Sequence, residues 1–77
     1  MRETVLEIIR STNSRVEPSS LDPDRSLLDQ GLDSLDMLSV YTKIEDEAGT
    51  RIPVENVGEM VTVDQLAAFM KSARSTA

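Results

Sequence analysis

The chain has 77 residues, with 14 acidic and 8 basic side chains, a formal net charge of -6, and neither cysteine nor histidine. A chain of this length is expected to form a single domain, 1–77, that buries only about 60% of its unfolded surface, too little for a deep catalytic cleft. The missing residue types exclude disulfides, thiolate nucleophiles, histidine acid–base chemistry and the usual zinc ligand sets. The charge disfavours nucleic acid and membranes as partners and favours basic protein surfaces.

The N-terminal segment has an amphipathic pattern. Val5, Ile8, Ile9 and Thr12 fall at i, i+3, i+4 and i+7, which predicts a helix over about residues 2–14. The pattern starts almost at the first residue, without the apolar run of a signal peptide or a span of about 20 apolar residues. We therefore expect a cytoplasmic protein.

The composition changes over residues 14–33, where prolines, serines and aspartates gather. Pro23 biases the residue before it away from helical angles, so the segment is predicted to be a long loop with at most one short turn at residues 26–29. A connection of roughly 20 residues is unusual in so small a domain and tends to be functional. Leu27, Leu28 and Leu32 are expected to anchor it to the core.

A second helix is predicted over Ser34–Ala48. Gly31 interrupts the preceding chain, and Asp33 and Ser34 both offer good N-cap side chains. The apolar positions that follow repeat with helical spacing; they are Met37, Val40, Tyr41, Ile44 and Ala48. Gly49 is expected to end this helix.

The remaining chain predicts one short and one longer helix. Ile52 and Pro53 form an extended dipeptide, followed by Val54–Gly58, which has room for one or two helical turns. Thr62 and Gln65 match a capping box at the start of a helix over about residues 62–73. The fold class is therefore all-α, a small four-helix bundle of three longer helices and one short, with the long loop between helices one and two.

The segment Gly31–Asp36 places the Ser34 hydroxyl on the first turn of a helix. An Asp-Ser pair before a helix is common capping chemistry, so an ordinary cap is the first interpretation. The serine lipase block Gly-Asp-Ser-Leu is interrupted here by Leu32, and no histidine can act as base. Lys43 lies nine residues farther along, about 13 Å of helical rise away. We therefore predict no catalytic residue and no enzyme.

The acidic loop also invites comparison with a calcium site. Asp22, Asp24, Ser26 and Asp33 resemble ligands of the twelve-residue EF-hand loop, but its sixth position would be Leu27 rather than glycine. Its last position lacks the bidentate glutamate. We expect at most weak adventitious binding and predict no metal site.

The six residues Gly31–Asp36 resemble the attachment motif of acyl carrier proteins, whose motif serine bears 4′-phosphopantetheine. Nearly the whole chain fits the family's order and spacing, including the Ile52-Pro53 turn 18 residues beyond the serine. The resemblance implies an acyl-carrier-type bundle that carries acyl thioesters on a 4′-phosphopantetheine arm derived from coenzyme A and attached to Ser34. It also implies that Asp33 helps a phosphopantetheinyl transferase to position its metal and the serine. A carrier serine needs no base of its own.

The resemblance also implies a partner surface on the second helix for acyl-loading and acyl-processing enzymes. The predicted partner-binding residues are Leu35, Asp36, Leu38, Glu45 and Asp46. The acidic members, with Asp33 and Glu47, could steer partners that present lysine and arginine, or could form an ordinary solvated face. The two leucines lie off the apolar stripe and could form a contact patch, with burial in the core as the alternative for Leu38. We expect a monomer.

Three positions depart from common fatty-acid carriers, which usually have glutamate at Ser39, a small residue at Lys43 and an aromatic residue at Ala48. These differences favour a specialised pathway, such as polyketide or amino-acid chemistry, over housekeeping fatty-acid synthesis. Asp33 before the serine favours an acyl carrier. A free-standing aminoacyl or peptidyl carrier, and an unmodified helical protein-interaction module, remain as alternatives.

Overall fold

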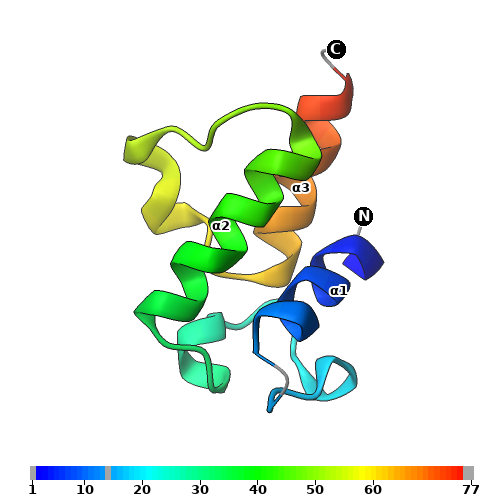
Figure 1. The fold of residues 1–77 in the computed structure, drawn as a ribbon, viewed down its shortest axis with the longest axis vertical. Helices are drawn as coiled ribbons and strands as arrows, with labels where there is room; N and C mark the ends of the chain where they lie inside the picture. The colour runs from blue at the N-terminus through cyan, green and yellow to red at the C-terminus, as the bar shows by residue number, and fades with distance from the viewer. Residues whose placement is uncertain (1, 14, 76–77) are drawn as a thin grey trace.

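The computed structural model describes residues 2–13 and 15–75, and every regular element in that part of the chain is helical. The elements follow in the order α1 (Arg2–Thr12), η1 (Pro18–Ser20), η2 (Leu27–Gln30), α2 (Ser34–Ala48), η3 (Val54–Glu59) and α3 (Val63–Ser75), where η denotes a 3-10 helix. Figure 1 shows α2 running diagonally in front of α3, with α1 beside them. Each of the three α-helices packs against the other two. No helix of the described ranges is both long and apolar enough to cross a membrane.

The core lies between the three α-helices because each presents one apolar stripe to the others. The first stripe falls where the spacing predicted it, but α1 ends at Thr12, before the described and non-helical Asn13. Residue 14, the predicted end of that helix, lies outside the described residues. The three α-helices contribute Val5, Ile8, Ile9, Met37, Val40, Ile44, Val63, Leu66 and Met70 to the core. Burying one such side chain contributes about 1.5 to 3 kcal/mol, so these contacts fix α2 within the fold.

Local signals set the ends of the longer helices. The helix α2 covers the predicted range and ends at Gly49, whose backbone is left-handed with φ of 73°. At the start of α3, the Thr62 hydroxyl oxygen accepts the Gln65 N–H (3.0 Å) and the Gln65 side-chain oxygen accepts the Thr62 N–H (3.2 Å). This confirms the predicted capping box.

The connection between α1 and α2 is tied to the rest of the fold at η2. The Leu27 N–H donates to the Val61 carbonyl (2.7 Å), and the side chains of Leu27 and Leu32 are buried as predicted. The prediction for Leu28 is wrong, because its side chain is 46% exposed. A 3-10 helix has three residues per turn, so adjacent side chains point about 120° apart and only one of the pair can face the core.

The segment predicted as a short fourth helix forms a 3-10 helix, η3, rather than α-helix. Six residues are too few for α-helical hydrogen bonds to offset the cost of nucleation, and short 3-10 segments are the usual result. Tyr41 holds this segment to α2, since its hydroxyl donates to the Met60 carbonyl (2.9 Å) just after η3. In Figure 1, the segment between α2 and α3 loops out beside α2.

Candidate functional site

Ser34 is the first residue of α2, and its side chain is exposed. The N-cap is Asp33, whose Oδ1 accepts the Asp36 N–H (2.8 Å), while the Asp36 carboxylate accepts the Asp33 N–H (3.2 Å). The two aspartates thus form a reciprocal capping box around the serine. Of the two N-cap candidates in the sequence, the structure uses Asp33, so the serine hydroxyl sits on the first turn without serving as the cap.

Asp36 is also bonded to the end of α1. Its Oδ2 accepts a hydrogen bond from Asn13 Nδ2 (2.9 Å) and is the same oxygen that accepts the Asp33 N–H. Asn13 is 8% exposed and is the buried polar residue of the described core. Asp36, predicted to be a partner-binding residue, is therefore already engaged within the fold, on the side of α2 that faces α1.

The predicted apolar patch is present at the surface. Leu35 is 73% exposed and Leu38 is 59% exposed, so the core alternative for Leu38 is wrong. Successive helical residues are about 100° apart, which places both leucines on the same side of α2 as Asp46, whose side chain is also exposed. Ser39, which the sequence analysis named only as a departure from common carriers, and Thr42, which it did not name, are also exposed on this side.

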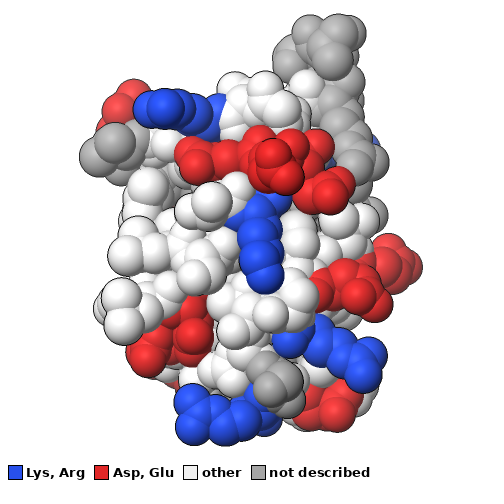
Figure 2. Space-filling view, in the orientation of Figure 1, with Lys and Arg blue, Asp and Glu red and all other residues white. Residues whose placement is uncertain are grey.

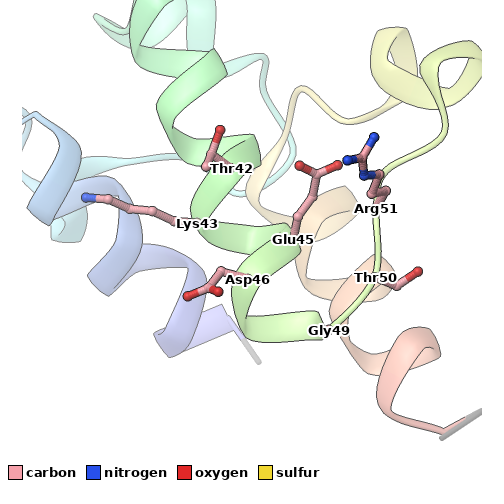
Figure 3. Close-up of a pocket in the computed structure, with 7 residues that line it drawn as sticks. All are labelled: Thr42, Lys43, Glu45, Asp46, Gly49, Thr50 and Arg51. Carbon is pink, nitrogen blue, oxygen red and sulfur yellow. The ribbon is translucent and has the colours of Figure 1, made fainter.

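Glu45 lies at the other end of α2 and has a structural contact. Its carboxylate accepts the backbone N–H of Ile52 (2.7 Å), which joins the last turn of α2 to the following loop. Figure 3 shows the side chain of Glu45 on α2 extending toward the loop that carries Arg51, and both residues line a pocket between α2 and this loop. Glu45 is about 16 Å of helical rise from Ser34, so the predicted residues do not form one cluster.

Lys43 points toward α1, as Figure 3 shows, and its ammonium group donates to the Ser11 hydroxyl (2.9 Å). The lysine therefore lies on the same side of α2 as Asp36, seven residues earlier. Figure 2 shows acidic side chains gathered over both ends of α2, with a largely uncharged surface and a basic side chain between them. The charge on this helix is thus divided into two acidic regions.

Asn13 is a residue of this site that the sequence analysis missed. It follows Val5 and Ile9 at the four-residue spacing of one helix face, so its burial could have been anticipated. The identity of its partner could not, because Asp36 is 23 residues away in the chain. Within the described residues, no group of three or more acidic side chains is arranged to hold a metal ion.

The sequence profile of the phosphopantetheine attachment site family matches residues 3–70. The chain belongs to this family. The meromycolate extension acyl carrier protein of Mycobacterium tuberculosis is 32% identical over 68 residues, which cover 87% of this chain and 58% of that protein. The protein of the same name from Mycolicibacterium aurum is 33% identical over 66 residues, covering 84% of this chain and 67% of that protein.

A further relative of this carrier chain is the phthioceranic/hydroxyphthioceranic acid synthase of Mycobacterium tuberculosis. It is 38% identical over 55 residues, which cover 71% of this chain and 3% of the synthase. Members of this family bear covalently attached 4′-phosphopantetheine, and the meromycolate relatives are named as carrier proteins. The matched residues therefore belong to a carrier family that is not itself catalytic.

The first turn of α2 fits such a prosthetic group. The exposed Ser34 hydroxyl can be reached from solvent, and the positive end of a helix favours an attached phosphodiester by about 0.3 to 1 kcal/mol. Repulsion from the flanking aspartates opposes this. It is reduced because both carboxylates already accept N–H groups, and the Asp36 carboxylate also accepts the Asn13 amide.

Proposed function

We propose that this chain is an acyl carrier protein whose 4′-phosphopantetheine arm is attached to Ser34, within a single domain, 1–77. The observation that carries the proposal is the exposed serine on the first turn of α2, directly after a capping aspartate, in a chain of the phosphopantetheine attachment family. In this proposal η3 takes the place of the short helix of a four-helix carrier fold, and the connection between α1 and α2, with η1 and η2, takes the place of its long loop.

Attachment is a substitution at phosphorus, carried out by a separate phosphopantetheinyl transferase. The Ser34 oxygen forms a bond to the phosphorus that bears the pantetheine in coenzyme A, and the bond from that phosphorus to the bridging oxygen of the pyrophosphate breaks. Adenosine 3′,5′-bisphosphate leaves with the bridging oxygen, and the serine proton passes to the transferase or solvent. The terminal thiol of the attached group then holds an acyl group as a thioester.

The roles of the flanking residues follow from their positions. Asp33 holds the first turn in place through its cap and presents a carboxylate beside the serine, where it can help the transferase position its metal. Leu35 and Leu38 supply exposed apolar area for acyl-loading and acyl-processing enzymes. Asp46 offers a charge to basic groups on the same partners. Asp36 and Glu45 contribute less to docking than their charge implies, because their carboxylates bind within the fold.

We infer that the cargo is an acyl group of a specialised lipid pathway. The relatives are named for meromycolate extension and for phthioceranic acid synthesis, which supports an acyl cargo over an aminoacyl one. Asp33 before the serine supports the same choice. A free-standing aminoacyl or peptidyl carrier is the second candidate, and the cytoplasmic location and monomeric state expected from the sequence remain predictions.

The decisive experiment is the intact mass of the purified chain before and after incubation with coenzyme A and a broad-specificity transferase. The parent should gain one phosphopantetheinyl group, and Ser34→Ala should gain none. Ser39→Ala is the matched control, because Ser39 is another exposed serine on the same helix. Loading of Ser34→Ala would refute the assignment of the site. No loading of a folded parent, with the transferase active on another carrier, would favour an unmodified interaction module.

A further inference from the structure

Asn13 occupies a position where its side-chain amide has a single satisfactory orientation. Its Oδ1 accepts the Arg15 N–H (3.0 Å), so this atom must be the oxygen, and the opposite atom, Nδ2, must face Asp36. The contact with Asp36 therefore joins an N–H donor to a carboxylate (2.9 Å), which is stronger than a bond between neutral groups. Asn13 is buried, so water has little access to its side-chain amide.

The same contact connects two elements that are distant in sequence. Asn13 follows α1 directly, and its own backbone N–H donates to the Ile9 carbonyl (2.9 Å), which anchors it to the last turn of that helix. Asp36 belongs to the first turn of α2 and is one half of the capping box around Ser34. The rotamer that lets Asp36 reach the Asp33 N–H is the one that Asn13 holds.

We propose that Asn13 is a positioning residue for modification of Ser34. It fixes the Asp36 carboxylate, and through the capping box it fixes the Asp33–Ser34 backbone relative to the last turn of α1. The Ser34 hydroxyl is then already oriented when the transferase binds, which lowers the entropic cost of reaching the reacting geometry. This inference rests on the proposed function, because it concerns loading of the same serine.

A purely structural role would give a different pattern. Tyr41 provides the comparison, since its hydroxyl also donates to a carbonyl from a partly buried position on α2. It binds after η3, on the side of α2 that faces away from Asn13, two turns from Ser34. Loss of either hydrogen bond should lower stability, but only the loss at Asn13 should alter the first turn of α2.

The test compares the parent with Asn13→Asp, Asn13→Leu and Tyr41→Phe. Asn13→Asp keeps an acceptor for Arg15 but sets a carboxylate against Asp36. Asn13→Leu is uncharged and close in size to the parent, so it separates the loss of the hydrogen bond from the effect of added charge. It also replaces Asn13→Asp in the test if that variant does not fold. The kcat and KM of transferase loading and the amide hydrogen exchange of each chain are measured where all are folded.

We expect kcat/KM to fall about tenfold in Asn13→Asp and about fivefold in Asn13→Leu, mainly through kcat, and less than twofold in Tyr41→Phe. The Asp36 amide, which donates to Asp33, should exchange faster in both Asn13 variants while core amides of α3 change less. Equal losses in Tyr41→Phe and the Asn13 variants, or unchanged loading and exchange, would overturn the positioning role. If the parent itself is not loaded, the proposed function fails, while the exchange data still test the link to Asp36.

Discussion

Because Asp33 and not Ser34 caps α2, substitutions of these two residues should have different effects on the stability of the fold. Asp33→Ala removes the N-cap side chain, which costs about 1 kcal/mol, and removes a carboxylate from the positive end of the helix, which adds about 0.5 kcal/mol. Ser34→Ala changes a residue that is not the cap, and alanine is the better helix former by a few tenths of a kcal/mol, about 0.3. We therefore expect a loss of about 1.5 kcal/mol for the first variant and almost none for the second.

Thermal unfolding followed by far-ultraviolet circular dichroism measures this contrast. For a domain of this size about 1 kcal/mol shifts Tm by about 4 to 8 °C, so Asp33→Ala should unfold about 6 to 12 °C lower than the parent. Asp33→Asn is the matched control, because asparagine caps as well as aspartate but carries no charge. It should keep the cap and lose only about 0.5 kcal/mol, or about 2 to 4 °C in Tm, and it should load more slowly if the carboxylate serves the transferase. A Ser34→Ala variant as unstable as Asp33→Ala would refute the assignment of Asp33 as the cap.

Two further predictions concern acidic residues away from the serine. Glu45→Ala should lower the free energy of unfolding by about 1 to 2 kcal/mol in urea denaturation, because the buried Ile52 N–H loses its acceptor. The control Asp46→Ala should change the free energy of unfolding by less than about 0.5 kcal/mol. Equal losses in the two variants would contradict the role of Glu45. A hydrogen bond with Asp64, and the charge of Asp64, raise the pKa of Asp24 above its ordinary value of 3.8. The folded state therefore binds the Asp24 proton more tightly than the unfolded state, and stability falls as pH rises from 3.8 through the raised pKa. Asp24→Asn should therefore be more stable than the parent at pH 7, and an advantage that does not shrink as pH falls toward 3.8 would refute this explanation.

Much of the fold could be predicted because the three α-helices carry their own signals. The stripe of α1, the range of α2 and the capping box of α3 depend on residues within about four positions of one another, and all three predictions are confirmed. The errors fall where local signals were balanced. Leu27 and Leu28 are equally apolar, and only packing decides which of them faces the core. Residues 54–58 were correctly predicted to be helical, but the segment 54–59 has only six residues and is held by Tyr41, and it forms a 3-10 helix rather than an α-helix.

The site could be predicted only in part, because some of its contacts join residues that are distant in sequence. The motif Gly31–Asp36 contains Ser34, its flanking aspartates and Leu35 together, and Leu38 follows only two residues later. The contacts of Asp36 with Asn13, of Lys43 with Ser11 and of Glu45 with Ile52 depend on how α2 meets its neighbours. A count of acidic residues could not show which carboxylates are already occupied.

These contacts change what the charge of α2 can do for recognition. Of the residues predicted to steer partners, Asp33 and Asp36 bind backbone N–H groups at the start of the helix, and Glu45 binds one at its end. Lys43 adds a positive charge between the two acidic regions. The leucines Leu35 and Leu38 and the carboxylate of Asp46 remain exposed on one side of the helix. We therefore propose that charge in this chain serves first to fix the helix that presents the serine, and that the apolar patch beside the serine contributes more to partner recognition than the net charge implies.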